Sequence, residues 1–207
     1  LEKTQLELFS KEDQLNNLSN SLTLKKHELQ ERSARVSELE GMIVKKDSIV
    51  TALKQSISNA LIGLEGEGLT IEKRNGKVYL SLEEELLFPS GQYKINSSGV
   101  IALNKLANAL ALQKDLDILV EGHTDSIPVS SKKLIKDNWD LSVMRATNVV
   151  KVLLNNPSLN PLQLTAAGKG QFSPLATNTN QQGRRMNRRI EIILSPNLGD
   201  LFKLLEK

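Results

Sequence analysis

The sequence of 207 residues contains no cysteine, two histidines and few aromatic residues, which make up 3% of the chain. Without cysteine, the chain forms neither disulfides nor thiolate metal sites, and it has no Cys nucleophile. His123 lies far along the sequence from the other histidine, His27, so a closed zinc site is not available from these residues. We therefore interpret His123 as a structural residue and predict no metal site and no cofactor.

Long apolar runs are also absent from the sequence. No stretch of about 18 apolar residues occurs, so we expect no segment of this sequence to span a membrane. The first residue is Leu1 rather than Met, and we expect a signal or anchor to precede it in a longer precursor.

The chain has little excess of either charge, since 27 basic and 24 acidic residues leave a net charge of +3. The basic excess is local and lies in one cluster formed by Arg184, Arg185, Arg188 and Arg189. Such a cluster indicates an anionic partner, although a solvated surface run has the same pattern. Nucleic acid is not expected as that partner, because no aromatic residues alternate with these arginines.

Residues 1–62 have an apolar residue at every seventh position, which is typical of a coiled-coil helix. These positions, designated a, are Leu1, Leu8, Leu15, Leu22, Leu29, Val36, Ile43, Val50 and Ile57. The d positions are weaker, because several of them are Lys or Arg. From Val36 to Ile57, β-branched residues at a combine with Leu39 and Leu53 at d, a pattern that favours two parallel strands. We therefore predict a parallel homodimer; a single amphipathic surface helix is the alternative.

Gly63, Gly66 and Gly68 end this helix, and we interpret residues 63–68 as a linker. The globular domain, predicted at 69–195, opens with a hairpin around Asn75-Gly76, the dipeptide that type I′ turns prefer. The remaining predicted elements are strands at 116–120, 162–166 and 189–194, helices at about 97–112 and 139–155, a loop at 168–183, and a C-terminal helix at 196–207. This order predicts an α+β fold, a two-layer sandwich with a mixed four-stranded sheet and an added hairpin, preceded by the coiled coil.

Charged residues that suit a binding site occur in three polar segments of this domain. Asp125 follows a predicted buried strand, at the strand end where α/β sites commonly open. Arg145 lies on the next helix, and Arg188 precedes the last strand. Each has a structural alternative, which is a turn cap for the carboxylate and an ion pair for the guanidiniums. Brought together, they would fit a zwitterionic amino acid, with its ammonium on Asp125 and its carboxylate on Arg145 or Arg188.

No pattern in the sequence indicates catalysis. There is no Gly-x-Ser-x-Gly elbow, no Cys–His pair and no supported Ser–His–Asp order. A carboxylate pair for glycoside hydrolysis would need Asp125 with Asp140 or Glu121, and none of these shows a sign of acid–base function. We therefore predict a binding protein and not an enzyme such as a cell-wall hydrolase.

Four motifs, in this order and spacing, resemble those of the OmpA/MotB C-terminal, peptidoglycan-binding domain family. They are Phe88-Pro89-Ser90-Gly91, Gly122-His123-Thr124-Asp125, Asn138-x-x-Leu141-Ser142-x-x-Arg145-Ala146 and Asn187-Arg188-Arg189-x-Glu191. The resemblance implies non-covalent binding of peptidoglycan through the diaminopimelate of its stem peptide. It implies that Asp125 and Arg145 clamp that amino acid. The implied supporting contacts come from Thr124, Asn138, Asn187 and Arg188.

Pro89 departs from those family members that have an acid at this position, so a contact there is expected from the backbone or not at all. The loop at 126–137 resembles the flagellar-motor branch and a group of Bacteroidetes-type outer-membrane lipoproteins, and residues 136–146 resemble the second group most. In that group a lipidated N-terminus precedes a coiled coil and this domain. The resemblance therefore implies a protein on the periplasmic side of the outer membrane that anchors this membrane, or an envelope complex, to the cell wall. The alternative is a MotB-like stator subunit of an ion-driven motor.

Overall fold

The computed structural model describes residues 2–63, 68–89, 91–113, 115–129 and 135–197. It divides into two units, Leu1–Lys46 and Asp47–Lys207. Residues 198–207 of the C-terminal helix predicted at 196–207, and residues 64–67 of the linker predicted at 63–68, lie outside the described residues. None of the described helices offers a stretch with the length and apolar character that crossing a membrane requires.

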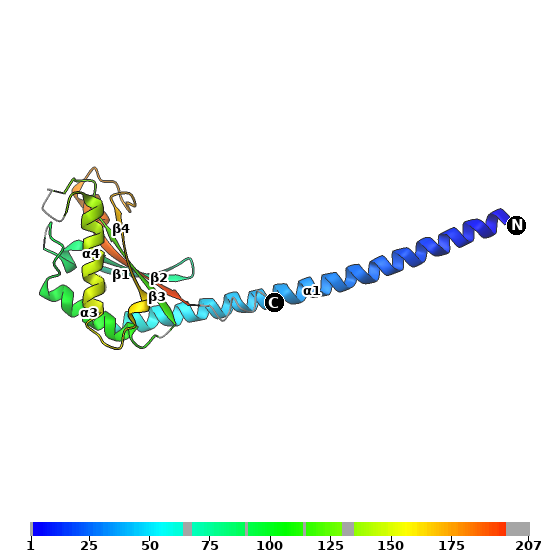
Figure 1. Ribbon diagram of the computed structural model, residues 1–207, viewed down its shortest axis with the longest axis horizontal. Helices are drawn as coiled ribbons and strands as arrows, with labels where there is room; N and C mark the ends of the chain where they lie inside the picture. The colour runs from blue at the N-terminus through cyan, green and yellow to red at the C-terminus, as the bar shows by residue number, and fades with distance from the viewer. Residues whose placement is uncertain (1, 64–67, 90, 114, 130–134, 198–207) are drawn as a thin grey trace. The chain divides into compact units, whose positions relative to one another are not determined.

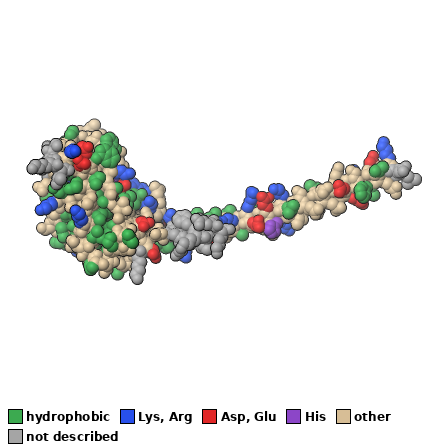
Figure 2. Space-filling model, viewed as in Figure 1, with side chains coloured by type: hydrophobic (Ala, Val, Ile, Leu, Met, Phe, Trp, Pro, Cys, Tyr) green, Lys and Arg blue, Asp and Glu red, His purple; other side chains and the backbone are tan. Residues whose placement is uncertain are grey.

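The first unit belongs to a single helix, α1 (Glu2–Ala60). Ion pairs one turn apart, such as Arg32–Glu28 at 2.9 Å, line its polar surface and support the helix modestly. Its a positions from Leu8 to Ile43 are exposed in the single chain, and Ile43 has 67% of its surface accessible. Figure 2 shows such hydrophobic side chains exposed along α1 between charged ones. An isolated helix without a packed face is not stable by propensity alone, so this apolar series requires a partner surface.

One mixed sheet of five strands organises the second unit, with the order β1-β2-β5-β3-β4 (Figure 1). The strands are β1 (Leu69–Arg74), β2 (Lys77–Glu83), β3 (Leu116–His123), β4 (Leu164–Gly170) and β5 (Arg189–Pro196). Only β3 and β4 pair in parallel, because α4 connects them; the other pairs are antiparallel. The predicted hairpin is confirmed, since Asn75 and Gly76 have φ values of 52° and 68°, as a type I′ turn requires. The predicted α+β class is confirmed too, with the hairpin as part of one sheet.

The helices of this unit begin at polar caps. They are α2 (Glu84–Leu87), α3 (Ser97–Leu110), α4 (Asn138–Leu153), the 3-10 turn η1 (Pro161–Gln163) and α5 (Gln181–Asn187). Asn96 caps α3 by accepting from the Gly99 N–H. The short helix α5 was not predicted, and it begins within the predicted loop at 168–183. Its seven residues are mostly polar, so they contain too few apolar positions to show a helical period.

Helix α4 packs closely on β3 and β4 through two glycines. A Cβ atom at Gly122 would lie 2.1 Å from the Ser142 carbonyl oxygen, and one at Gly168 would lie 2.3 Å from the Ser142 hydroxyl. Gly122 therefore faces the helices. Because side chains alternate along a strand, Glu121 and His123 point to the opposite face of the sheet.

The end of α1 belongs to the core of the second unit. Val50, Leu53, Ile57 and Leu61 are at most 4% exposed and pack in the same cluster as the buried residues of the sheet and of α3. Lys73 of β1 also contacts this segment, since its Nζ lies 2.6 Å from an Asp47 carboxylate oxygen. The sequence pattern assigned Val50, Leu53 and Ile57 to a dimer seam, but their own chain covers them. The available seam therefore ends before Val50, and the folded domain begins near residue 47 and not at 69.

Truncating this docked segment is expected to destabilise the domain. Replacing Ile57 with alanine should lower the free energy of unfolding by about 2–5 kcal/mol, because a fully buried side chain leaves a cavity. The control is Ile62→Ala, since Ile62 is 75% exposed and should change stability by less than about 0.5 kcal/mol. Urea denaturation of both variants measures the difference. Equal midpoints for the two would contradict the docking of α1.

Candidate binding pocket

A pocket of about 490 Å³ opens beside the C-terminal end of β3. Its charged lining consists of two carboxylates and two guanidiniums, so its formal charges cancel. They belong to Glu84, Asp125, Arg145 and Arg188. Its remaining walls come from Gly91, Thr124, Ile127, Pro128, Val129, Ile135, Asn138 and Leu141.

Four separate elements supply the charged residues of the pocket. Asp125 follows β3, Arg145 lies on α4, Glu84 opens α2 directly after β2, and Arg188 links α5 to β5. The Glu84 N–H donates to the Arg188 carbonyl at 2.9 Å, which holds these two segments side by side. The three segments expected from the sequence therefore converge, and the fold adds Glu84 as a fourth member.

The charges alternate in sign along a chain of contacts. Arg145 donates from Nη2 to Oε1 of Glu84. Arg188 places Nε 2.6 Å from Oε2 of Glu84 and donates from Nη1 to Oδ2 of Asp125 at 2.9 Å. Asp125 and Arg145 are thus connected through Glu84 and Arg188, and both line the same pocket.

Arg145 is the most enclosed of the four, with 2% of its surface exposed. Its Nε donates to the Gln92 carbonyl at 2.9 Å, and its guanidinium lies 5.1 Å from the centre of the Phe88 ring. Burial lowers the pKa of Arg145, and the Glu84 carboxylate opposes that shift. Its remaining nitrogen, Nη1, has no hydrogen-bond partner among the described residues, which leaves a donor for a ligand.

Arg188 is more accessible, with 27% of its side chain exposed. Burial alone would lower the pKa of Arg188, but its hydrogen bond to Asp125 and the charge of Glu84 together raise it. This guanidinium therefore stays charged and lies at the mouth of the pocket between the two carboxylates.

Thr124 and Asn138, which were predicted to contact the ligand, form hydrogen bonds that hold the backbone around Asp125. Thr124 donates from its hydroxyl to the Asp125 carbonyl at 3.0 Å, and the Asn138 amide donates to the carbonyls of Asp125 and Ile127. Oδ1 of Asp125 accepts from the Ile127 N–H at 2.9 Å. These bonds fix the carboxylate while both residues also line the pocket.

Asn187 is not among the residues that line the pocket, and its supporting contact to a ligand stays a prediction. It is fully buried, and its side chain accepts from the N–H groups of Leu175 and Ala176 and donates to the Ala176 carbonyl. Asn187 therefore braces the loop before α5, and any effect on a ligand is exerted through the position of Arg188 next to it.

Sequence reasoning missed Glu84. A signal was present, because buried positions alternate along β2 at Val78, Leu80 and Leu82, and the next one in that period is Glu84. An acid on the core-facing register of a strand costs free energy unless it is paired. The charged partners of Glu84, Arg145 and Arg188, lie more than 60 residues away.

The arginine cluster at 184–189 does not form one basic surface. Arg184 donates to the Asn178 carbonyl, Arg185 pairs with Glu83 and Glu85, and Arg188 and Arg189 point to different carboxylates. Arg185 and Arg188 share the Glu85 carboxylate, at 3.2 and 4.0 Å, whereas Arg184 and Arg189 contact other groups. The sequence left open whether this cluster binds an anionic partner or is a solvated surface run. In the structure, the four arginines do not form a single anion-binding surface.

This α+β fold, with an alternating carboxylate–guanidinium pocket at the end of β3, defines an OmpA-like ligand-binding domain. Residues 87–188 match the model of the OmpA family, and the chain belongs to this family through that segment. Motility protein B of Bacillus subtilis (strain 168) is 33% identical over 117 residues, which cover 56% of this chain and 44% of that protein. Motility protein B of Helicobacter pylori is covered over 62% of its length. The chain thus spans about half the length of these curated relatives.

Solved structures have the same fold. The periplasmic domain of Helicobacter pylori MotB is 31% identical with a TM-score of 0.62, and the alignment covers 70% of this chain and 90% of that one. The cell wall anchor of the T6SS from Pseudomonas aeruginosa is 27% identical with a TM-score of 0.62, and the alignment covers 68% of this chain and 96% of that one. The predicted family is therefore confirmed, whereas the lipoprotein branch within it stays a prediction.

Proposed function

We propose that the second unit binds peptidoglycan non-covalently through the diaminopimelate of the stem peptide. The observation that carries this proposal is that Asp125 and Arg145 line one pocket, although 20 positions and a helix boundary separate them in the chain. In addition, the family is that of OmpA, and one structural relative is named as a cell wall anchor.

A zwitterion suits this pocket for an electrostatic reason. Its two carboxylates and two guanidiniums cancel, so a ligand with one ammonium and one carboxylate adds no net charge to a partly enclosed site. The ammonium would join Asp125, which is fixed by the Ile127 N–H. The carboxylate would accept from Nη1 of Arg145 and from Arg188, in charge-assisted hydrogen bonds.

The test is calorimetric titration of the full chain with meso-diaminopimelate. The matched ligand control is 1,5-diaminopentane, because it keeps the carbon chain and both ammonium groups of diaminopimelate and lacks both carboxylates. Saturable binding of meso-diaminopimelate without binding of 1,5-diaminopentane is the expected result. A folded chain that binds neither diaminopimelate nor purified cell-wall sacculi would overturn the proposal. The full chain is needed, because residues 50–61 are part of the core.

We propose an anchoring function in the periplasm, with no catalysis, for which the named motility and anchor relatives are the support. Attachment to the outer membrane through an N-terminal anchor is the first candidate. A MotB-like stator subunit is the second, and the similarity to Motility protein B over 56% of the chain favours it. Density-gradient fractionation of cell membranes separates the two, since the first predicts the outer-membrane fraction and the second the inner one.

The first unit is proposed to form a parallel homodimer through α1 before Val50. Its exposed a positions need a partner surface, so sedimentation should give a dimer at micromolar concentrations. Replacing both Val36 and Ile43 with lysine should give a monomer whose second unit remains folded. The control is Leu24→Lys, because Leu24 is 72% exposed and lies off the seam. A wild-type monomer would contradict this prediction.

A further inference from the structure

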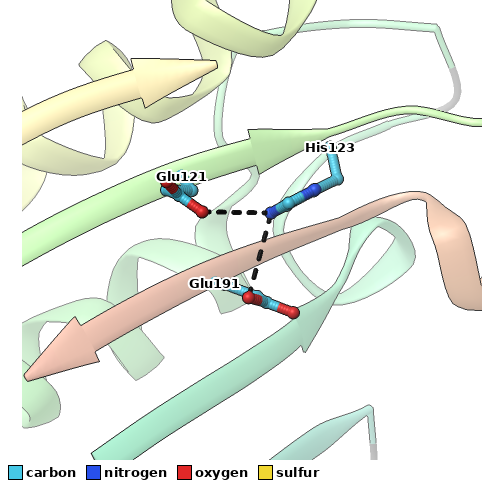
Figure 3. Close-up of side chains that lie close together, drawn as sticks. All are labelled: Glu121, His123 and Glu191. Carbon is cyan, nitrogen blue, oxygen red and sulfur yellow. Dashed lines mark ion pairs between the residues drawn. The ribbon is translucent and has the colours of Figure 1, made fainter. Parts of the chain in front are cut away.

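Three ligating side chains meet on the face of the sheet that lies away from α4. Glu121 and His123 extend from β3 on the same face, and Glu191 lies directly opposite Glu121 on β5. Figure 3 shows the three side chains pointing toward one another. Nε2 of His123 is 3.8 Å from Oε2 of Glu121 and 3.9 Å from Oε2 of Glu191. One ligand atom from each residue lies within 4.8 Å of the others.

Without a bound cation, this arrangement of two carboxylates and an imidazole lowers the stability of the sheet. Like charges directly opposite each other on neighbouring strands are destabilising, and these two carboxylates are nearly buried, with side-chain exposures of 12% and 9%. His123 is 2% exposed, and neither of its ring nitrogens has a hydrogen-bond partner in the structure. Buried polar groups are almost always satisfied, so an unpartnered histidine aimed at two carboxylates indicates a missing ligand.

The neighbouring cationic side chains contact only one of the two oxygen atoms of each carboxylate, Oε1. Arg189 donates to Oε1 of Glu191 at 2.8 Å, and Lys169 lies 3.5 Å from Oε1 of Glu121. The Oε2 atom of each carboxylate faces Nε2 of His123 instead. One oxygen from each acid and one imidazole nitrogen thus surround a common point.

The imidazole makes no direct hydrogen bond with either carboxylate, because its Nε2 atom lies 3.8 Å from Oε2 of Glu121 and 3.9 Å from Oε2 of Glu191. This spacing is too long for hydrogen bonds between the three groups, and it suits three ligand atoms placed around one cation.

We propose that Glu121, His123 and Glu191 bind one divalent transition-metal ion, Zn²⁺ in the first instance. Imidazole nitrogen and carboxylate oxygen are ligands that Zn²⁺ takes, and three protein ligands leave a fourth position for water. A point equidistant from ligand atoms at this spacing lies ~2.2–2.8 Å from each, so small side-chain rotations reach the usual ~2.0–2.2 Å. Because Gly122 faces α4, this site and the helices lie on opposite faces of the sheet. The ion would therefore cross-link β3 to β5.

The experiment is zinc analysis of the full chain after stripping with EDTA, dialysis against ZnCl₂ and removal of free metal. Wild type is expected to retain one zinc ion per chain. Glu121→Gln and His123→Asn are expected to bind zinc about tenfold more weakly or worse. The matched control is His27→Asn, which removes the other histidine, an exposed residue on α1, and should retain zinc like wild type. Circular dichroism and sedimentation check that the variants are folded.

X-ray absorption at the zinc edge tests the wild type without any substitution. One nitrogen and at least two oxygen neighbours are expected for the bound ion. Retention of zinc by folded Glu121→Gln and His123→Asn would overturn the proposal, and so would loss of zinc in His27→Asn alone. A wild-type chain that retains no zinc, or an absorption spectrum without an imidazole ligand, would overturn it as well.

Discussion

Replacing Asp125 with alanine is expected to weaken the binding of meso-diaminopimelate by about 2–5 kcal/mol, or about 30-fold to several thousand-fold in Kd. Asp125 is 5% exposed and provides the carboxylate for a ligand ammonium. Its removal would leave the bound ammonium without a counter-charge and release Arg188, which now donates to it at 2.9 Å. Calorimetric titration of the full chain measures the loss.

Two further variants separate charge from local structure at this position. Asp125→Asn retains an oxygen that accepts from the Ile127 N–H, so it should keep the loop in place and still lose most of the affinity. Asp117→Ala removes an exposed aspartate from the other end of β3 and should bind like wild type. A near-wild-type titration for Asp125→Ala would remove this residue from the proposed site.

Replacing Arg145 with alanine should lower the free energy of unfolding by about 3–5 kcal/mol as well as abolish ligand binding. Arg145 and Glu84 have side-chain exposures of 3% and 7%, so the substitution leaves a buried carboxylate short of its main partner. It also removes the donor to the Gln92 carbonyl. Chemical denaturation measures the stability change, and because binding requires the folded state, titrations of this variant need a fold control.

The Glu84→Gln substitution shows whether the stranded charge causes this effect. Added to Arg145→Ala, it removes the uncompensated carboxylate and should recover part of the lost stability, which gives a positive coupling in a double-mutant cycle. Arg185→Ala is the control, because Arg185 is half exposed and its pairs with Glu83 and Glu85 are worth under about 1 kcal/mol. Equal effects of Arg145→Ala and Arg185→Ala would show that the buried pair does not support the fold.

The limits of the domain illustrate why burial is hard to assign from a heptad pattern. Apolar residues at Val50 and Ile57 continue the series that begins at Leu8, and periodicity alone does not show which surface covers them. The fold covers Val50 and Ile57 with the chain's own sheet and leaves Ile43 exposed. A dimer seam and a docked helix need the same apolar side chains, so only the tertiary structure separates them.

Local signals in the sequence were sufficient for the five strands, for α3 and α4, and for three of the four charged residues of the pocket. Asn75-Gly76 determined the hairpin, because few other dipeptides accept two positive φ values. Asp125, Arg145 and Arg188 stood out as charged residues next to predicted strands and a helix, and the structure brings them to one pocket. The tertiary structure decided the rest, namely Glu84 between the two arginines, Asn187 as a loop brace and Glu191 opposite Glu121. These depend on pairing between β2, β5 and β3, whose register is set by contacts between residues distant in sequence, and no local pattern encodes such contacts.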